Sequence, residues 1–149
     1  MRGRAKTFKT VCIGGTFSSF HQGHQDYLDL AFSLADNVII GINNTEYAQH
    51  SKQYQVPLVD KRISVIKEYL AEKGWLVDAK IIVYSSQSDC NDLLPNETIE
   101  CALVIDEYYE MARSLNLRRI ELGIKEYHIH IKPRTMLEGA DLSSSALIN

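Results

Sequence analysis

The sequence lacks a long apolar run. Nowhere do about 18 apolar residues follow one another, the length that a membrane-spanning helix needs. The N-terminal segment MRGRAKTFKT is basic, but no apolar signal segment follows it. We therefore expect a cytoplasmic protein with no membrane partner.

An excess of charge of one sign is also missing. The chain has 16 Lys and Arg residues against 19 Asp and Glu residues, a formal net charge of -3, and the two signs are mixed along its length. Extended contact with a nucleic-acid backbone requires a basic stripe, so we expect no nucleic-acid partner. A small anionic substrate needs only a local basic pocket, and this class of ligand stays open.

Cysteine is scarce and badly spaced for cross-linking. The three cysteines, Cys12, Cys90 and Cys101, are odd in number and show no C-x-x-C spacing. This pattern argues against a disulfide framework and against a structural zinc site. A reducing cytoplasm suits such a chain.

Short β-branched runs alternate with longer segments of helical periodicity, as in a parallel sheet covered on both faces. The 149 residues have the length of one domain. We predict one domain, residues 1–149, with an α/β fold: a Rossmann-like, doubly wound five-stranded parallel sheet with helices on both faces. The predicted strands are residues 10–14, 37–42, 80–84, 101–105 and 126–132, and the predicted helices are residues 24–34, 58–73 and 108–122.

Two polar segments are longer than a packing connection requires. NNTEYAQHSKQYQVP follows the second predicted strand, and SSQSDCNDLLPNE follows the third. Long polar loops at the carboxyl end of a parallel sheet commonly face substrate. We predict that both segments are loops that cover a ligand.

A glycine-rich turn joins the first predicted strand to the first helix, within CIGGTFSSFHQGHQDYLDLAF. Gly14 and Gly15 carry no side chain where the strand ends, so backbone N–H groups can approach an anion there, and Thr16 adds a hydroxyl. In an open α/β sheet this turn lies at the carboxyl edge, where ligands bind. The turn therefore predicts part of a phosphate site.

Two histidines follow at the start of the helix. His21 and His24 flank Gly23, where unpaired N–H groups and the helix dipole favour negative charge. Taken singly, either histidine is explained as well by a helix cap or a packed side chain. The pair together with G-G-T-F favours an anion-binding hollow.

The stretch GGTFSSFHQGH resembles the G-x-F-(x)-x-x-H-x-G-H signature of the nucleotidyltransferase superfamily, in which one position is optional. Within it, the chain is most similar to the archaeal and eukaryotic type of phosphopantetheine adenylyltransferase. AFSLADNVIIG and SKQYQVPLVDKR resemble the segments that follow the signature in that group. Asn116, Arg119 and Gly123 match N-x-x-R-x-x-x-G, and LSSSALIN resembles its serine-rich helix start.

The resemblance implies transfer of AMP from ATP to a phosphate-bearing acceptor, 4′-phosphopantetheine, with release of pyrophosphate and no covalent enzyme intermediate. Catalysis of this kind depends on alignment and on neutralising charge, so the protein must supply donors and cations. It also implies Mg²⁺, bound mainly through the phosphates and water because the motif offers no carboxylate cage. The expected partners are small molecules, and the sequence also allows a homo-oligomer.

The resemblance also implies roles for individual residues. His21 and His24 would contact the triphosphate, with His24 next to the α-phosphate, and Lys52 and Arg62 would be further catalytic cations. Three serines, Ser143, Ser144 and Ser145, can cap a helix and offer N–H groups to the β- or γ-phosphate, although an ordinary N-cap is the alternative. The predicted nucleotide-binding residues are Gly14, Gly15, Thr16, Phe17, Gly23, Glu107, Asn116, Arg119, Ser143, Ser144 and Ser145.

One departure from the family pattern keeps other functions open. The closing arginine of the family falls near Ile148, where this chain has no cation. A nucleotide-binding module without turnover would tolerate that loss. A second alternative is a cytidylyltransferase that uses CTP and glycerol 3-phosphate or a related alcohol phosphate, because KPRTMLEGADLSSS also resembles the R-T-x-G-I-S-T-T segment of such enzymes.

Overall fold

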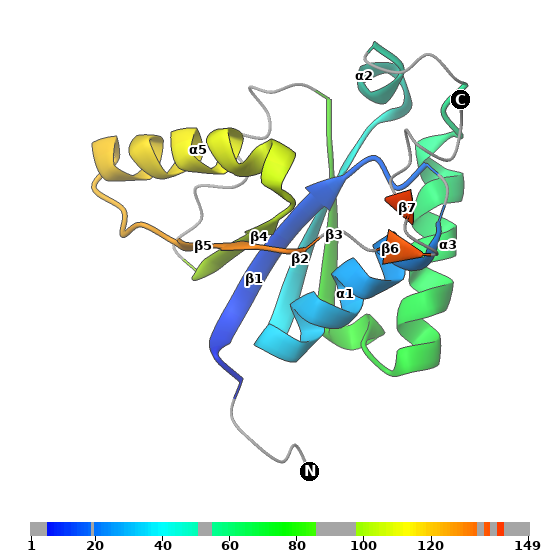
Figure 1. Cartoon of the computed structure of the whole chain (residues 1–149), viewed down its shortest axis with the longest axis horizontal. Helices are drawn as coiled ribbons and strands as arrows, with labels where there is room; N and C mark the ends of the chain where they lie inside the picture. Colours follow the sequence, from blue (N-terminus) through cyan, green and yellow to red (C-terminus); the bar gives the residue numbers. More distant parts are fainter. Residues whose placement is uncertain are drawn as a thin grey trace.

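Five parallel strands form the central sheet in the order β3-β2-β1-β4-β5 (Figure 1). The computed structural model describes residues 6–18, 20–50, 55–85, 98–133, 136–137 and 140–141. The strands of the sheet are β1 (Phe8–Gly15), β2 (Ala35–Asn43), β3 (Ala79–Tyr84), β4 (Cys101–Val104) and β5 (His128–Ile131). The helices are α1 (Gln22–Leu34), α2 (Thr45–His50), α3 (Val59–Lys73) and α5 (Tyr109–Glu121), with 3-10 turns η1 (Leu76–Asp78) and η2 (Asp106–Tyr108).

The predicted elements are confirmed, with ends that differ by no more than two residues from those expected. The prediction of a loop after β2 is wrong in part, because α2 lies within it. Ala48 is fully buried and its N–H donates to the carbonyl of Asn44, so tertiary packing stabilises a helix too short for its periodicity to be recognised. A short hairpin of β6 (Met136–Leu137) and β7 (Ala140–Asp141) was also not predicted. Of the second predicted loop, residues 86–97 lie outside the described part.

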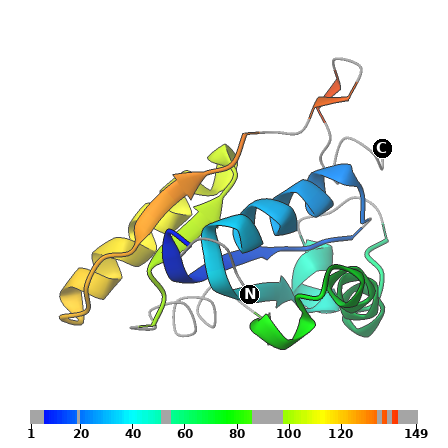
Figure 2. The same ribbon diagram turned by 90° about the horizontal axis from the view of Figure 1, so that it is seen from below.

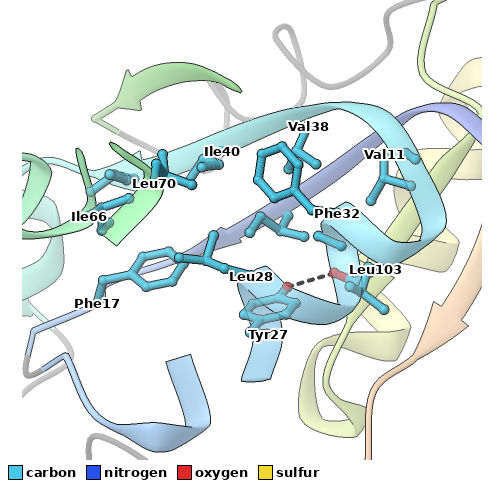
Figure 3. Packing of buried hydrophobic residues seen from close by; sticks show 14 of the residues in the cluster. Val11, Phe17, Tyr27, Leu28, Phe32, Val38, Ile40, Ile66, Leu70 and Leu103 are labelled. Carbon is cyan, nitrogen blue, oxygen red and sulfur yellow. Dashed lines mark hydrogen bonds between the residues drawn. The ribbon is translucent and has the colours of Figure 1, made fainter. Parts of the chain in front are cut away.

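Side chains alternate between the two faces of the sheet and build two cores. Val11 and Ile13 pack in the larger cluster with residues of α1 and α3, such as Leu28 and Ile66 (Figure 3). Cys12, between them, joins the smaller cluster on the other face, together with residues that include Ala102 of β4 and Leu115 of α5. Helices therefore cover both faces, as predicted for a doubly wound sheet. Figure 2 shows α1 along the central strands and α5 beside β4 and β5.

The order of the strands reverses at β1, which lies between β2 and β4. β1 pairs with β4 at Val11–Cys101 and Cys12–Ala102, near the start of β4. At the next residue of β4, the buried hydroxyl of Tyr27 in α1 donates to the carbonyl oxygen of Leu103 at 2.6 Å (Figure 3). The helix that begins with the two histidines is thus tied to β4 at the point where such sheets bind ligands.

No helix in the described part of the chain has the length and apolar character needed to cross a membrane. The longest of these helices, α3, has 15 residues and an exposed polar side.

Tyr27→Phe tests the bond between α1 and β4. The change leaves the Leu103 carbonyl buried without its donor, so we expect the free energy of unfolding to fall by about 1–2 kcal/mol. Urea denaturation at neutral pH measures it. Tyr109→Phe, on the first turn of α5, is the matched control. Equal stability of the two variants would show that the hydrogen bond contributes nothing.

Candidate functional site

The turn after β1 is held by an aromatic side chain that points inward. Phe17 has a positive φ of 52°, unusual for a residue with a side chain, and its ring is 3% exposed. A Cβ added to Gly15 would lie 3.3 Å from that ring, which is a tight contact, so a side chain at this position would press against Phe17. Gly14 stands beside Gly41 of β2 and is also without a side chain at the carboxyl edge. The predicted glycine turn is therefore present, and packing alone explains Gly15.

His21 and His24 cap α1 reciprocally. His21 is the N-cap residue, and its Nδ1 accepts the Gly23 N–H at 2.9 Å. The His21 N–H in turn donates to Nδ1 of His24 at 3.4 Å. The two imidazole rings stack with their centroids 4.0 Å apart and an interplanar angle of 17°. In this capping box, histidines occupy both positions.

The cap decides which nitrogen of each ring can face a ligand. Because Nδ1 of His21 accepts a hydrogen bond, the proton of the neutral ring must be on Nε2. Burial, and then the positive charge of Lys132, lower the pKa of His21. Its Nε2 is buried and has no hydrogen-bond partner among the residues that the structure describes. In His24 the cap likewise involves Nδ1.

Lys132 is a buried cation at the same end of the sheet, and the sequence analysis did not select it. It follows β5 directly at the same carboxyl edge, and its side chain is 6% exposed. The sequence suggests only a strand-end lysine, because nothing in the alternation of HIHIK distinguishes a buried ammonium from a solvated one. The histidine motif and the end of β5 meet only in the folded chain.

Arg62 lies at the carboxyl ends of the strands, but its guanidinium donates hydrogen bonds to backbone carbonyls. Its side chain is 3% exposed and donates to the carbonyls of Pro57, Thr16 and Asn43 at 2.8, 2.9 and 2.8 Å. These carbonyls belong to the segment before α3, the glycine turn and the end of β2. The predicted cation is therefore positioned at the carboxyl edge, where it joins the two loops that follow β1 and β2.

Asn116 and Arg119 lie at the opposite end of the sheet, where its strands begin. Asn116 exchanges two hydrogen bonds of 2.9 Å with the backbone of Tyr127, just before β5. Arg119 is 1% exposed and donates to the carbonyls of Lys125 and Ile99, which precede β5 and β4. Since strands of a parallel sheet begin at one edge and end at the other, these side chains are not brought together with His21. The geometry gives them a structural role and does not support contact with the nucleotide base.

The remaining predicted residues are described only in part. Gly23 lies in the first turn of α1 and Glu107 in η2, directly after β4, although the side chain of Glu107 is not described. Four predicted residues lie outside the described part of the chain: Lys52, Ser143, Ser144 and Ser145.

Comparison with known proteins agrees with this arrangement. Residues 12–149 match the family model described as cytidylyltransferase-like. The chain belongs to this family. A phosphopantetheine adenylyltransferase of Methanothermobacter thermautotrophicus is 31% identical over 124 residues, which cover 83% of this chain and 73% of that protein. Another, from Methanopyrus kandleri, is 26% identical over 141 residues, or 94% and 88% of the two chains. The predicted resemblance to the archaeal enzymes is confirmed.

Solved structures with the same fold are also known. A protein of unknown function from Archaeoglobus fulgidus superposes with a TM-score of 0.72 at 24% identity, covering 90% of this chain and 99% of its own. A lipopolysaccharide core biosynthesis protein from Thermoplasma volcanium gives 0.67 at 19% identity, with 85% and 98% covered. At these identities the cytidylyltransferase-like chain shares the fold with them, and no more is concluded.

Acid should weaken the histidine cap. The pKa of His21 is lower in the folded protein than its usual 6.5, so the unfolded chain takes up the proton more readily. The stability that this group contributes is complete above pH 6.5 and is lost as the pH falls below it. His21→Asn keeps a capping side chain that does not titrate. We expect the melting temperature of the wild type to fall more than that of His21→Asn between pH 7.5 and 5.5, and equal falls would contradict the neutral cap.

Proposed function

We propose that this chain is an adenylyltransferase that moves AMP from ATP to 4′-phosphopantetheine and releases pyrophosphate. The observation that carries the proposal is the stacked histidine pair at the amino end of α1, in which the buried Nε2–H of His21 has no partner among the described residues. Its position at the switch in strand order suits a nucleoside triphosphate. The naming of the archaeal relatives supports the choice of substrates.

In the proposed reaction the protein forms no covalent bond with either substrate. An oxygen of the acceptor phosphate attacks the α-phosphorus of ATP, the bond from that phosphorus to the bridging oxygen of the β-phosphate breaks, and pyrophosphate leaves with the electron pair. Donors fixed in place before the reaction stabilise charge that develops on the phosphoryl oxygens. In our proposal His24 faces the α-phosphate, and His21 binds the chain of phosphates beside it. Arg62 orients the turn that carries them.

The donor set at the site suits phosphate better than a bare metal ion. Within the described ranges, no group of three or more His, Cys, Asp or Glu side chains is placed to hold a metal. Imidazole N–H groups and an ammonium bind phosphate oxygens, whereas Mg²⁺ prefers carboxylates, phosphates and water. Mg²⁺ in this proposal arrives with ATP and, when bound, neutralises charge on the triphosphate. The enzyme would act in the cytoplasm on small molecules.

Pyrophosphate release from paired substrates tests the function. With Mg²⁺ present, ATP and 4′-phosphopantetheine should give pyrophosphate, and a chelator should stop its release without a change in melting temperature. CTP with glycerol 3-phosphate should give none, because a pocket that pairs with adenine leaves polar groups unpaired around cytosine. Turnover of the CTP pair alone would identify a cytidylyltransferase. Nucleotide binding without turnover of either pair would identify a binding module.

His24→Ala tests the catalytic role of the pair. A donor whose contact strengthens as charge develops affects the rate more than substrate affinity, and its loss typically costs ~10²- to 10³-fold. We expect kcat to fall by that factor while the Kd for ATP changes little. His128→Ala, at the start of β5 on the far edge, is the matched control. Equal kcat in the two variants would remove His24 from the mechanism.

A further inference from the structure

The side chain of Lys132 lies on the same face of the sheet as the histidine pair. The backbone N–H of Lys132 donates to the Val104 carbonyl at 2.7 Å, so this residue continues the pairing of β5 with β4. Tyr127 and Ile129 pack on the α5 face, which places His128, His130 and Lys132 on the α1 face by alternation. A contact between the rings of His128 and Phe8, a residue that packs against the α1-side core, supports this assignment.

The ammonium of Lys132 is turned inward and not toward solvent. A lysine at the end of an edge strand can extend into water at little cost, yet this side chain is 6% exposed. Its Nζ donates to the carbonyl of Pro133 at 2.6 Å. Burying a charge is costly, and the cost is greater near the amino end of a helix, whose dipole is also positive. Such a placement is favourable when an anion binds between the groups.

His21 provides the second half of the argument. Its Nε2–H is buried and has no partner among the described residues, and His21 begins the helix that covers the face of the sheet on which Lys132 lies. A phosphate oxygen would satisfy this donor and pair with the ammonium.

We propose that Lys132 is a substrate-binding cation, which binds a phosphate oxygen together with Nε2–H of His21. The proposal rests on the proposed function for the identity of its ligand. The phosphate belongs either to the nucleoside triphosphate or to the acceptor. Both sources offer the same chemistry, a phosphate oxygen with at least one negative charge, and the experiment separates them.

Calorimetric titration of Lys132→Gln tests the proposal without turnover. The ligands are ATP and adenosine in one arm and 4′-phosphopantetheine and pantetheine in the other. Loss of one charge-assisted hydrogen bond should weaken binding roughly 10- to 100-fold for the phosphorylated member of one pair, with its unphosphorylated partner unchanged. Lys132→Arg should retain most of the affinity. The control Lys125→Gln removes an exposed lysine at the other edge.

The outcomes are distinct. Weaker binding of ATP alone assigns Lys132 to the triphosphate, and weaker binding of 4′-phosphopantetheine alone assigns it to the acceptor. Unchanged affinity for both in a folded Lys132→Gln protein would overturn the proposal. If the wild type binds ATP but releases no pyrophosphate, the proposed function fails while the effect of Lys132→Gln on ATP still tests the lysine.

A variant that does not fold leaves a test in the wild type. Saturating phosphorylated ligand should shift the side-chain NMR signal of Lys132 in the wild type more than that of Lys125. A Lys132 signal that stays in place with each phosphorylated ligand would overturn the proposal.

Discussion

The reciprocal cap between His21 and His24 is the interaction on which the site depends. Nδ1 of each ring accepts a hydrogen bond from a backbone N–H at the start of the helix. The same two hydrogen bonds that begin α1 therefore also orient both Nε2 atoms. An aspartate cap would start the helix equally well but would offer no donor on its other side. In our proposal the Nδ1 side of each ring caps the helix, and the Nε2–H of His21 faces the phosphate.

Other buried polar groups keep that cap in place from a distance. Arg62 ties the glycine turn to the end of β2, and Phe17 fills the space beneath the turn. At the other edge, Asn116 and Arg119 fix the backbone that enters β5 and thereby the register in which Lys132 emerges. These residues act through positions of the backbone, because their donors are directed at carbonyl oxygens. Their removal would disturb the backbone around the site.

The sheet and its main helices could be predicted because β-branched runs and helical periodicity report directly on burial. The position of the two histidines at the start of the helix, beside a glycine turn, could be predicted because the turn and the helix periodicity meet there. Spacing alone could not separate Asn116 and Arg119, which bind backbone, from residues that bind substrate. Lys132 could not be predicted, since its burial depends on β5 lying beside β4 and on α1 covering the same face. Contacts between distant segments determine both cases.

The hydrogen bond from Tyr27 to Leu103 joins residues 76 positions apart. A nascent chain that has emerged only as far as β3 already contains the glycine turn and both histidines, yet it has no β4 to receive the Tyr27 hydroxyl and no Lys132. Closing so long a loop costs chain entropy that only the packing of the last strands repays. The histidine pair and Lys132 are thus joined late in synthesis, and a truncated product would carry both histidines without the strands β4 and β5 beside them.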